Sequence, residues 1–331
     1  MDQPHATFAA ICESYALKPD GSARRISERV WHLPTDRGEF AVKLYTIDQQ
    51  VRANKEAAVL AHLATTHGDA RFRVQTLQRT AAGGTTWTGF GGHAMLTRWE
   101  AGQFRTYDTF TPAEWRALGA SLAALHLRLD RLHLPALDTI RARLAAIDAD
   151  DMRRSLLEAL EHTPPEGDRA LLRTYVDACL RMLDEHYPGS IDAFPAGDAQ
   201  HPIHNDYNQF NYLFDGALPP VILDWEATIG APREFEVVRC LNHLPLEAPA
   251  SAEVFVRAYL NVRSLDPERM IWAVDAACLQ HALKLWVLQG WLNDPRRFNS
   301  HLNGAMTMVS TMDGARSRLI DFFSSCLEAG S

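Results

Sequence analysis

The sequence lacks the features that would place it in a membrane, on nucleic acid or outside the cell. No run approaches 18 uncharged apolar residues, and Met1–His5 has neither the basic region nor the apolar run of a signal peptide. Lys and Arg total 33 against 41 Asp and Glu, so the net charge is −8 and a basic nucleic-acid face is not expected. We therefore expect a cytoplasmic protein with no membrane or nucleic-acid partner.

Cysteine and histidine are too scattered to indicate a metal centre or a disulfide framework. The five cysteines form no Cys-x-x-Cys pair and are odd in number, which is typical of reduced thiols in the cytoplasm. The 14 histidines include no His-x-x-x-His pair, the spacing that places two ligands on one helix face. Zinc and disulfides are therefore not expected.

The first hundred residues predict a small antiparallel sheet and one long helix. Strand-like runs at 26–33 and 39–45 flank a Pro-Thr-Asp-Arg-Gly turn and predict a hairpin. Lys43 interrupts the apolar second run, so its ammonium must face water or a negative group. The following helix carries Glu56, the candidate partner of Lys43. Later runs at 72–77 and 93–99 bring the strand-like runs to four, and we expect a small sheet of five strands in all.

The stretch from 204 to 226 contains the highest density of candidate functional residues. It reads His-Asn-Asp at 204–206, Asn211 five residues later, then two short apolar strands joined by a turn, and Asp224 at the end of the second strand. Asn211 and Asp224 thus sit on one hairpin, and their oxygens suit Mg²⁺ with nucleotide phosphates as its other ligands. Asp206 remains as a base for an attacking hydroxyl.

This His-x-Asp-x-x-x-x-Asn pattern, followed by Asp-aromatic, resembles the catalytic and metal-binding segments of the aminoglycoside phosphotransferase, choline kinase and homoserine kinase superfamily. The resemblance implies an α+β, bilobal protein-kinase-like fold. Residues 1–99 would form a nucleotide-binding lobe with a small antiparallel sheet, and residues 100–331 a mostly helical lobe for catalysis and acceptor binding. ATP would lie between the lobes.

The same resemblance assigns roles to the residues already named. Lys43, oriented by Glu56, would hold the nucleotide phosphates, while Asn211 and Asp224 would bind Mg²⁺ and Asp206 would deprotonate the acceptor hydroxyl.

The nucleotide contacts outside these motifs are also implied by the resemblance. No Gly-x-Gly-x-x-Gly loop is present, so Ser22 and Ser27 would contact phosphates through hydroxyl or backbone groups. Arg98 and Trp99 lie where relatives cross between lobes and meet adenine with their main chain.

Other polar and aromatic residues have roles that remain open. Glu226 is either an additional metal contact or a solvated carboxylate, and Glu236 stands where relatives brace the catalytic loop. The acceptor pocket would be lined by late-helix side chains, for which the candidates are Asp275, Gln280, Trp286 and Trp291.

These inferences predict an ATP- and Mg²⁺-dependent kinase that phosphorylates a hydroxyl of a small molecule, such as the amino alcohols homoserine and choline. One alternative is an aminoglycoside or other antibiotic phosphotransferase. Another is a nucleotide-binding module without catalysis. A protein kinase is disfavoured, because Asn205 replaces the usual Arg and Asp-Phe-Gly is missing. We expect the chain to act as a monomer or homodimer.

Overall fold

The computed structural model describes residues 3–65, 69–135, 137–189, 201–282 and 285–328. Contacts between Cα atoms divide the chain into two compact units. The first contains residues 1–136 and 204–228, and the second contains residues 137–203 and 229–331. Residues 204–228 therefore pack with the N-terminal part of the chain. The expected lobe boundary at residue 99 stays a prediction.

A six-stranded antiparallel sheet forms the centre of the first unit. Its strands are β1 (Arg24–Arg25), β2 (Val30–Thr35), β3 (Gly38–Thr46), β5 (Leu77–Gln78), β6 (Trp87–Gly89) and β7 (Gly92–Arg98). The expected hairpin is present, with Thr35 opposite Gly38 across a two-residue turn. Gly38 has a φ of 103°, which a side chain would strongly disfavour, and so it permits this tight turn.

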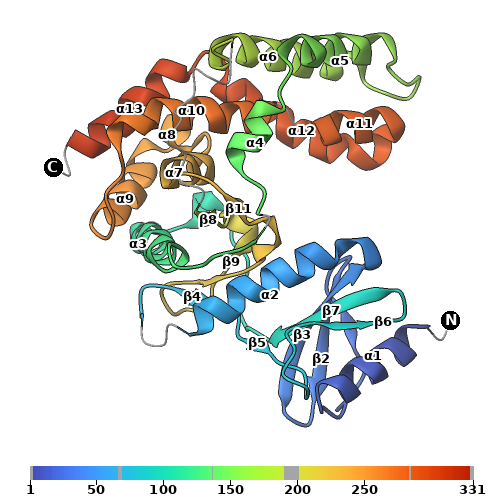
Figure 1. Ribbon diagram of the computed structural model, residues 1–331. Coiled ribbons are helices and arrows are strands. Elements are labelled where there is room, and N and C mark those ends of the chain that lie inside the picture. Colours follow the sequence, from blue (N-terminus) through green and yellow to red (C-terminus); the bar gives the residue numbers. More distant parts are fainter. Residues whose placement is uncertain (1–2, 66–68, 136, 190–200, 283–284, 329–331) are drawn as a thin grey trace. The chain divides into compact units, whose positions relative to one another are not determined.

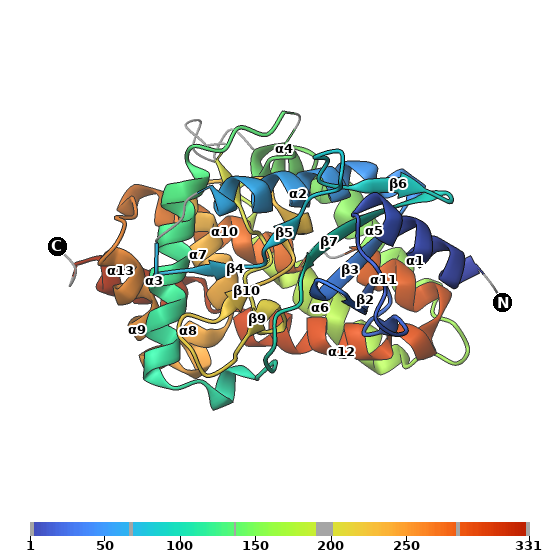
Figure 2. The same cartoon turned by 90° about the horizontal axis from the view of Figure 1, so that it is seen from below.

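The sheet has six strands instead of the expected five, because the short strands β1 and β6 lie outside the strand-like runs of the sequence. The run at 72–77 contributes to two sheets. Its first part, β4 (Arg73–Val74), pairs in parallel with β10 (Val221–Ile222), which also pairs with β9 (Tyr212–Leu213) (Figure 2). Arg73 fixes this pairing through two hydrogen bonds to Asp215, at 2.9 and 2.6 Å. Only β5 joins the large sheet.

Two helices cover opposite faces of the large sheet (Figure 1). Along β3, Phe40 and Val42 pack in one core with α1 (Gln3–Ser14). Alternation along the strand turns Lys43 and Tyr45 to the other face, toward α2 (Gln50–Ala64). The period of the strand therefore separates an apolar face from a polar one.

The helix α3 (Pro112–Leu129) supports the 204–226 stretch. Thr111 is its N-cap and accepts a hydrogen bond from the Glu114 amide, while the Glu114 carboxylate accepts one from the Thr111 amide. The Tyr207 hydroxyl donates to the Leu118 carbonyl at 3.0 Å. This buried contact connects the 204–226 stretch to α3.

The second unit is mostly helical. It contains a two-stranded pair, β8 (Pro202–Ile203) and β11 (Ile229–Gly230). Its helices are α4 (Ile140–Ala145), α5 (Ala149–Glu161), α6 (Arg169–His186), α7 (Arg233–Leu241), α8 (Leu244–Glu247), α9 (Pro249–Leu260), α10 (Pro267–Ala282), α11 (Leu285–Asn293), α12 (Pro295–Met312) and α13 (Arg316–Glu328). Helix α10 packs against α6, α7, α12 and α13 and is the centre of this unit.

The stretch 267–293 is the one candidate membrane span among the described residues, by length and composition alone. In the structure 73% of its apolar window is buried. That burial is the pattern of a core helix in a folded unit. All five cysteines are free and buried.

Replacing Thr111 with Ala should lower the free energy of unfolding by about 1 kcal/mol, because the first turn of α3 loses its side-chain acceptor. Urea denaturation followed by circular dichroism measures the change. Thr111→Ser keeps the hydroxyl and is the matched control. Equal stability of the Ala and Ser variants would contradict the capping role.

Candidate active site

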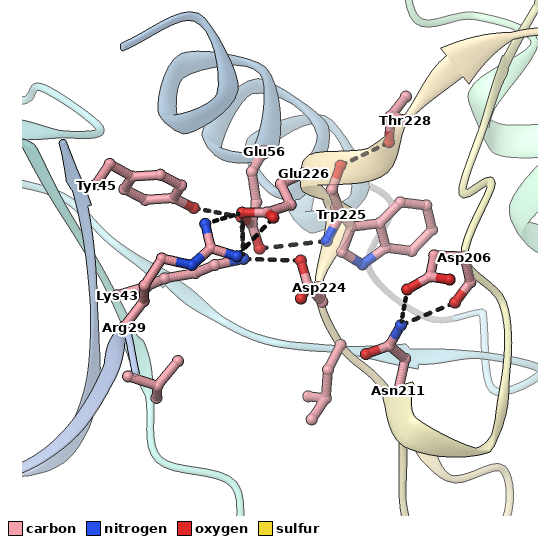
Figure 3. A network of polar contacts seen from close by, with 12 residues as sticks. Arg29, Lys43, Tyr45, Glu56, Asp206, Asn211, Asp224, Trp225, Glu226 and Thr228 are labelled. Carbon is pink, nitrogen blue, oxygen red and sulfur yellow. Dashed lines mark hydrogen bonds and ion pairs between the residues drawn. The ribbon is translucent and has the colours of Figure 1, made fainter. Parts of the chain in front are cut away.

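Lys43 lies at the centre of a cluster of carboxylates in the first unit (Figure 3). Its Nζ is 2.8 Å from Glu56 Oε2, 2.7 Å from Asp224 Oδ1 and 3.1 Å from Glu226 Oε2. Burial alone would lower the pKa of Lys43, but the three carboxylates outweigh burial and raise it. Lys43 is therefore a permanently charged ammonium.

Glu56 is the most deeply buried of these carboxylates, with a relative exposure of 1%. One of its oxygens accepts from Lys43 and from the Tyr45 hydroxyl, and the other accepts from the Trp225 amide at 3.2 Å. Burial and the nearby Glu56 charge raise the pKa of Tyr45, so its hydroxyl stays protonated and donates. The Lys43–Glu56 pair expected from the sequence is thus formed.

Asp206 and Asn211 form a second pair in the same unit (Figure 3). The Asn211 amide donates to the Asp206 carboxylate at 2.9 Å and to its carbonyl at 2.8 Å. Asn208 donates to the other carboxylate oxygen at 2.7 Å. Since the Asn211 nitrogen points at Asp206, its side-chain oxygen is the atom that Asn211 would offer to a cation.

Hydrogen bonds connect this pair to Asp224. His204 Nδ1 accepts from the Asp206 amide, so Nε2 carries the proton and donates to the Leu223 carbonyl at 2.8 Å. The Leu223 amide in turn donates to the Asn211 carbonyl at 3.0 Å. Both bonds end at the residue before Asp224, so His204 connects the Asp206 loop to this residue.

Asp224 has a left-handed backbone, with φ 61° and ψ 75°. This conformation costs a non-glycine residue about 1 kcal/mol or more and is tolerated where surrounding contacts impose it. It starts the 3₁₀ turn η5 (Trp225–Ala227), whose first amide reaches Glu56. The side chain is 38% exposed, so it is open to a ligand in addition to Lys43.

The donors around Asn211 and Asp224 fit the cation that the sequence implies. Both offer oxygen, and oxygen is what Mg²⁺ prefers. Oxygens of Glu56, Asp224 and Glu226 also lie within 4.8 Å of one another. Glu56 is the poorest ligand of these, because Lys43, Tyr45 and Trp225 already donate to it.

Sequence reasoning missed Arg29, which the structure brings to Glu226. Its two terminal nitrogens donate to the two Glu226 oxygens at 2.8 and 2.7 Å. No local pattern in the sequence indicates this pair, because its members are 197 positions apart. Tyr45 was also missed, although its place two residues after Lys43 on one strand was a usable signal.

The two serines proposed for phosphate contacts lie in different surroundings. Ser22 lines a pocket of about 300 Å³ together with Phe8, Trp31 and Leu33. The Ser27 hydroxyl accepts from the Val30 amide at 3.2 Å, in the turn that carries Arg29. Ser27 is thus near the charged cluster in sequence, whereas Ser22 faces a largely apolar pocket. Phosphate contacts by both serines remain predictions.

Arg98 and Trp99 make contacts within the sheet. The Arg98 guanidinium lies 4.6 Å from the centre of the Phe40 ring and donates to the Arg37 carbonyl at 2.6 Å. The Arg98 amide donates to the Thr76 carbonyl at 2.8 Å, and the Trp99 amide donates to the Glu39 carbonyl at 2.9 Å. These two main-chain donors are therefore engaged, and adenine contacts at this position remain a prediction.

Two of the expected acceptor-pocket residues, Asp275 and Trp291, lie buried in the second unit, and an acceptor role for them stays a prediction. Asp275 accepts two hydrogen bonds from Arg316, at 2.7 and 2.8 Å, and lies 2.9 Å from His186 Nδ1. Trp291 is fully buried.

The other acceptor-pocket candidates and the bracing candidate differ in how far they are buried. Trp286 is 58% exposed, and Gln280 is half-buried. Glu236 is buried on α7. Acceptor and bracing roles for these residues stay predictions.

Acid should selectively weaken the Arg29–Glu226 ion pair. Burial would raise the pKa of Glu226, but Arg29 and Lys43 lower it from 4.5 to about 2. A carboxylate with a depressed pKa stabilises the fold above its unfolded pKa and loses that contribution as the pH falls through its folded pKa. The wild type should thus exceed Glu226→Gln in unfolding free energy at neutral pH, and the difference should shrink from about pH 5 to about pH 2.

Urea denaturation at a series of pH values measures this difference. Glu28→Gln removes the exposed carboxylate of the residue directly before Arg29 and is the matched control. A stability difference between wild type and Glu226→Gln that does not change with pH would contradict the ion pair.

Solved structures that resemble this chain confirm the predicted fold. A spectinomycin phosphotransferase in complex with ADP and spectinomycin has a TM-score of 0.70 and 13% identity, covering 97% of this chain and 98% of that one. An amicoumacin kinase in complex with AMP-PNP and Ca²⁺ has a TM-score of 0.62 and 14% identity, with 92% of each chain covered. A microcompartment-associated aminopropanol kinase has a TM-score of 0.58 and 19% identity, covering 98% of this chain and all of the other.

Sequence comparison identifies the family. A search among curated proteins found no match. The sequence profile of the phosphotransferase enzyme family matches residues 22–272, which is most of the chain. This match confirms the superfamily expected from residues 204–226 and the prediction of a phosphotransferase. The chain belongs to the phosphotransferase enzyme family.

Proposed function

We propose that this phosphotransferase is an ATP-dependent kinase that transfers the γ-phosphoryl group to a hydroxyl of a small molecule. The observation that carries the proposal is Lys43 held between Glu56 and Asp224, at 2.8 and 2.7 Å. In kinases a lysine in this setting holds nucleotide phosphates, and the glutamate orients it. Nucleotides in the amicoumacin and spectinomycin enzyme structures are consistent with this proposal.

Each proposed catalytic residue has a task that its contacts allow. Lys43 would bind phosphate oxygens, and Asn211 and Asp224 would offer oxygens to Mg²⁺. When bound, that cation would neutralise charge on the phosphates. Asp206 would accept the proton of the acceptor hydroxyl, and the Asn208 and Asn211 amides would hold its carboxylate in place.

Positioning provides most of the acceleration in this mechanism. The bonds through His204 and Leu223 fix Asp206 relative to the residue that precedes Asp224. A base and a phosphate-binding lysine held on one connected scaffold lose little freedom when the substrates bind. The loose transition state of phosphoryl transfer mainly requires alignment and charge neutralisation.

For the acceptor we propose an amino alcohol or a similar metabolite. The net charge of −8 favours a cationic acceptor over an anionic one. The aminopropanol kinase, which resembles this chain, is named for an amino alcohol. Antibiotic phosphorylation is the second candidate, favoured by the spectinomycin and amicoumacin enzymes among the similar structures.

A non-catalytic nucleotide-binding module is the less favoured alternative. Such a module would need a lost catalytic group, yet Lys43, Asp206, Asn211 and Asp224 are all present and bonded as described. Nucleotide binding without turnover against any acceptor would identify this alternative. We further propose a cytoplasmic location and a monomeric or homodimeric state.

Mg-ATP consumption against pooled amino alcohols, aminoglycosides, sugars and nucleosides tests the function. One pool should be active, and dividing it should identify the acceptor. Asp206→Asn should lower kcat about 10²- to 10⁴-fold, because the transfer loses its base, while the Kd for Mg-ATP changes less than about twofold.

Asp215→Asn is the matched control, since Asp215 lies on the same hairpin but pairs with Arg73. It should keep the wild-type kcat. Equal turnover of wild type and Asp206→Asn would remove Asp206 from the mechanism, and no activity in any pool would contradict the proposed function.

A further inference from the structure

Three carboxylate oxygens already surround the Lys43 ammonium. They belong to Glu56, Asp224 and Glu226 and lie 2.8, 2.7 and 3.1 Å from Nζ. An ammonium has three hydrogens to donate. A phosphate oxygen can therefore bind Lys43 only if at least one of these carboxylates gives up its contact.

The three carboxylates differ in how readily they can give up their contact with Lys43. Glu56 is buried and tied to Tyr45 and the Trp225 amide, so it stays in place. Asp224 is 38% exposed and lies where the proposed Mg²⁺ would take it as a ligand. Glu226 is only 14% exposed, so it needs another cation if it leaves Lys43.

Arg29 is that other cation (Figure 3). It binds both oxygens of Glu226, at 2.8 and 2.7 Å, and shares Oε2 with Lys43. The shared oxygen is closer to Arg29 than to Lys43, at 2.8 against 3.1 Å. The Arg29 carbonyl accepts from the Leu44 amide at 2.8 Å, which anchors Arg29 beside the strand that carries Lys43.

We propose that Arg29 is a positioning residue that keeps Glu226 paired when the Lys43 ammonium turns away from it, and so releases Lys43 to the nucleotide phosphates. The inference rests on the proposed function. A forked guanidinium–carboxylate pair is stronger and more directional than a single ammonium contact. When Lys43 turns to phosphate, Glu226 stays paired with Arg29, and no buried carboxylate loses its partner. Arg29 thus acts through Glu226 and Lys43.

This role differs from direct phosphate binding by Arg29, and the two predict different results for a double variant. Without Arg29, Glu226 would retain Lys43 and nucleotide binding would weaken. Removing the Glu226 charge as well would free Lys43 again. A direct phosphate contact, once lost, would not be restored by a second substitution at Glu226.

Isothermal titration calorimetry with Mg-ATP on the full chain tests the proposal. Arg29→Gln should raise Kd about tenfold, and Glu226→Gln should keep it within about threefold of wild type. The double variant Arg29→Gln/Glu226→Gln should return to the value of Glu226→Gln. Arg52→Gln removes an exposed arginine from α2 and should leave Kd unchanged.

A double variant as weak as Arg29→Gln would overturn the proposal, as would a wild-type Kd in Arg29→Gln. Melting temperatures show whether each variant folds. If Arg29→Gln does not fold, Arg29→Lys keeps the charge without the fork, and the same weakening and the same rescue by Glu226→Gln are expected. A wild-type chain that does not bind Mg-ATP would instead contradict the proposed function itself.

Discussion

The rest of the site depends on the hydrogen bonds that the buried Glu56 carboxylate accepts. At 1% exposure it is stable only because Lys43, Tyr45 and the Trp225 amide all donate to it. These donors come from β3 and from the turn after Asp224, so one charge on α2 joins the sheet to the catalytic stretch. The alternation of β3 places Lys43 and Tyr45 on the face that meets this charge.

The remaining geometry follows from that anchor. The Trp225 amide is held by Glu56, and the residue before it, Asp224, has a left-handed backbone. The turn directs the Asp224 carboxylate to Lys43, while bonds through Leu223 connect it to Asn211 and His204. The local strain at Asp224 is thus offset by contacts on both sides, as is common at functional sites.

The sequence was sufficient to predict the features that depend on local patterns of residues. Lys43 within an apolar strand, Glu56 on the next helix and the spacing from His204 to Asp224 predicted a cluster, and the Lys43–Glu56 pair is formed. The pairing of Arg29 with Glu226 and the division of the run at 72–77 between two sheets were not predictable. Both depend on partners more than 140 positions away, which no periodicity or turn signal specifies.

The affinity of Glu56→Gln for Mg-ATP tests most directly whether this buried charge organises the site. A neutral amide has only one accepting atom, so it cannot accept from Lys43 and Tyr45 on one side and from the Trp225 amide on the other. We predict at least a tenfold higher Kd in Glu56→Gln, by about 1.4 kcal/mol or more, in a chain that remains folded by circular dichroism. Glu28→Gln, an exposed control, should keep the wild-type Kd. Wild-type affinity in a folded Glu56→Gln would contradict the role given to Glu56.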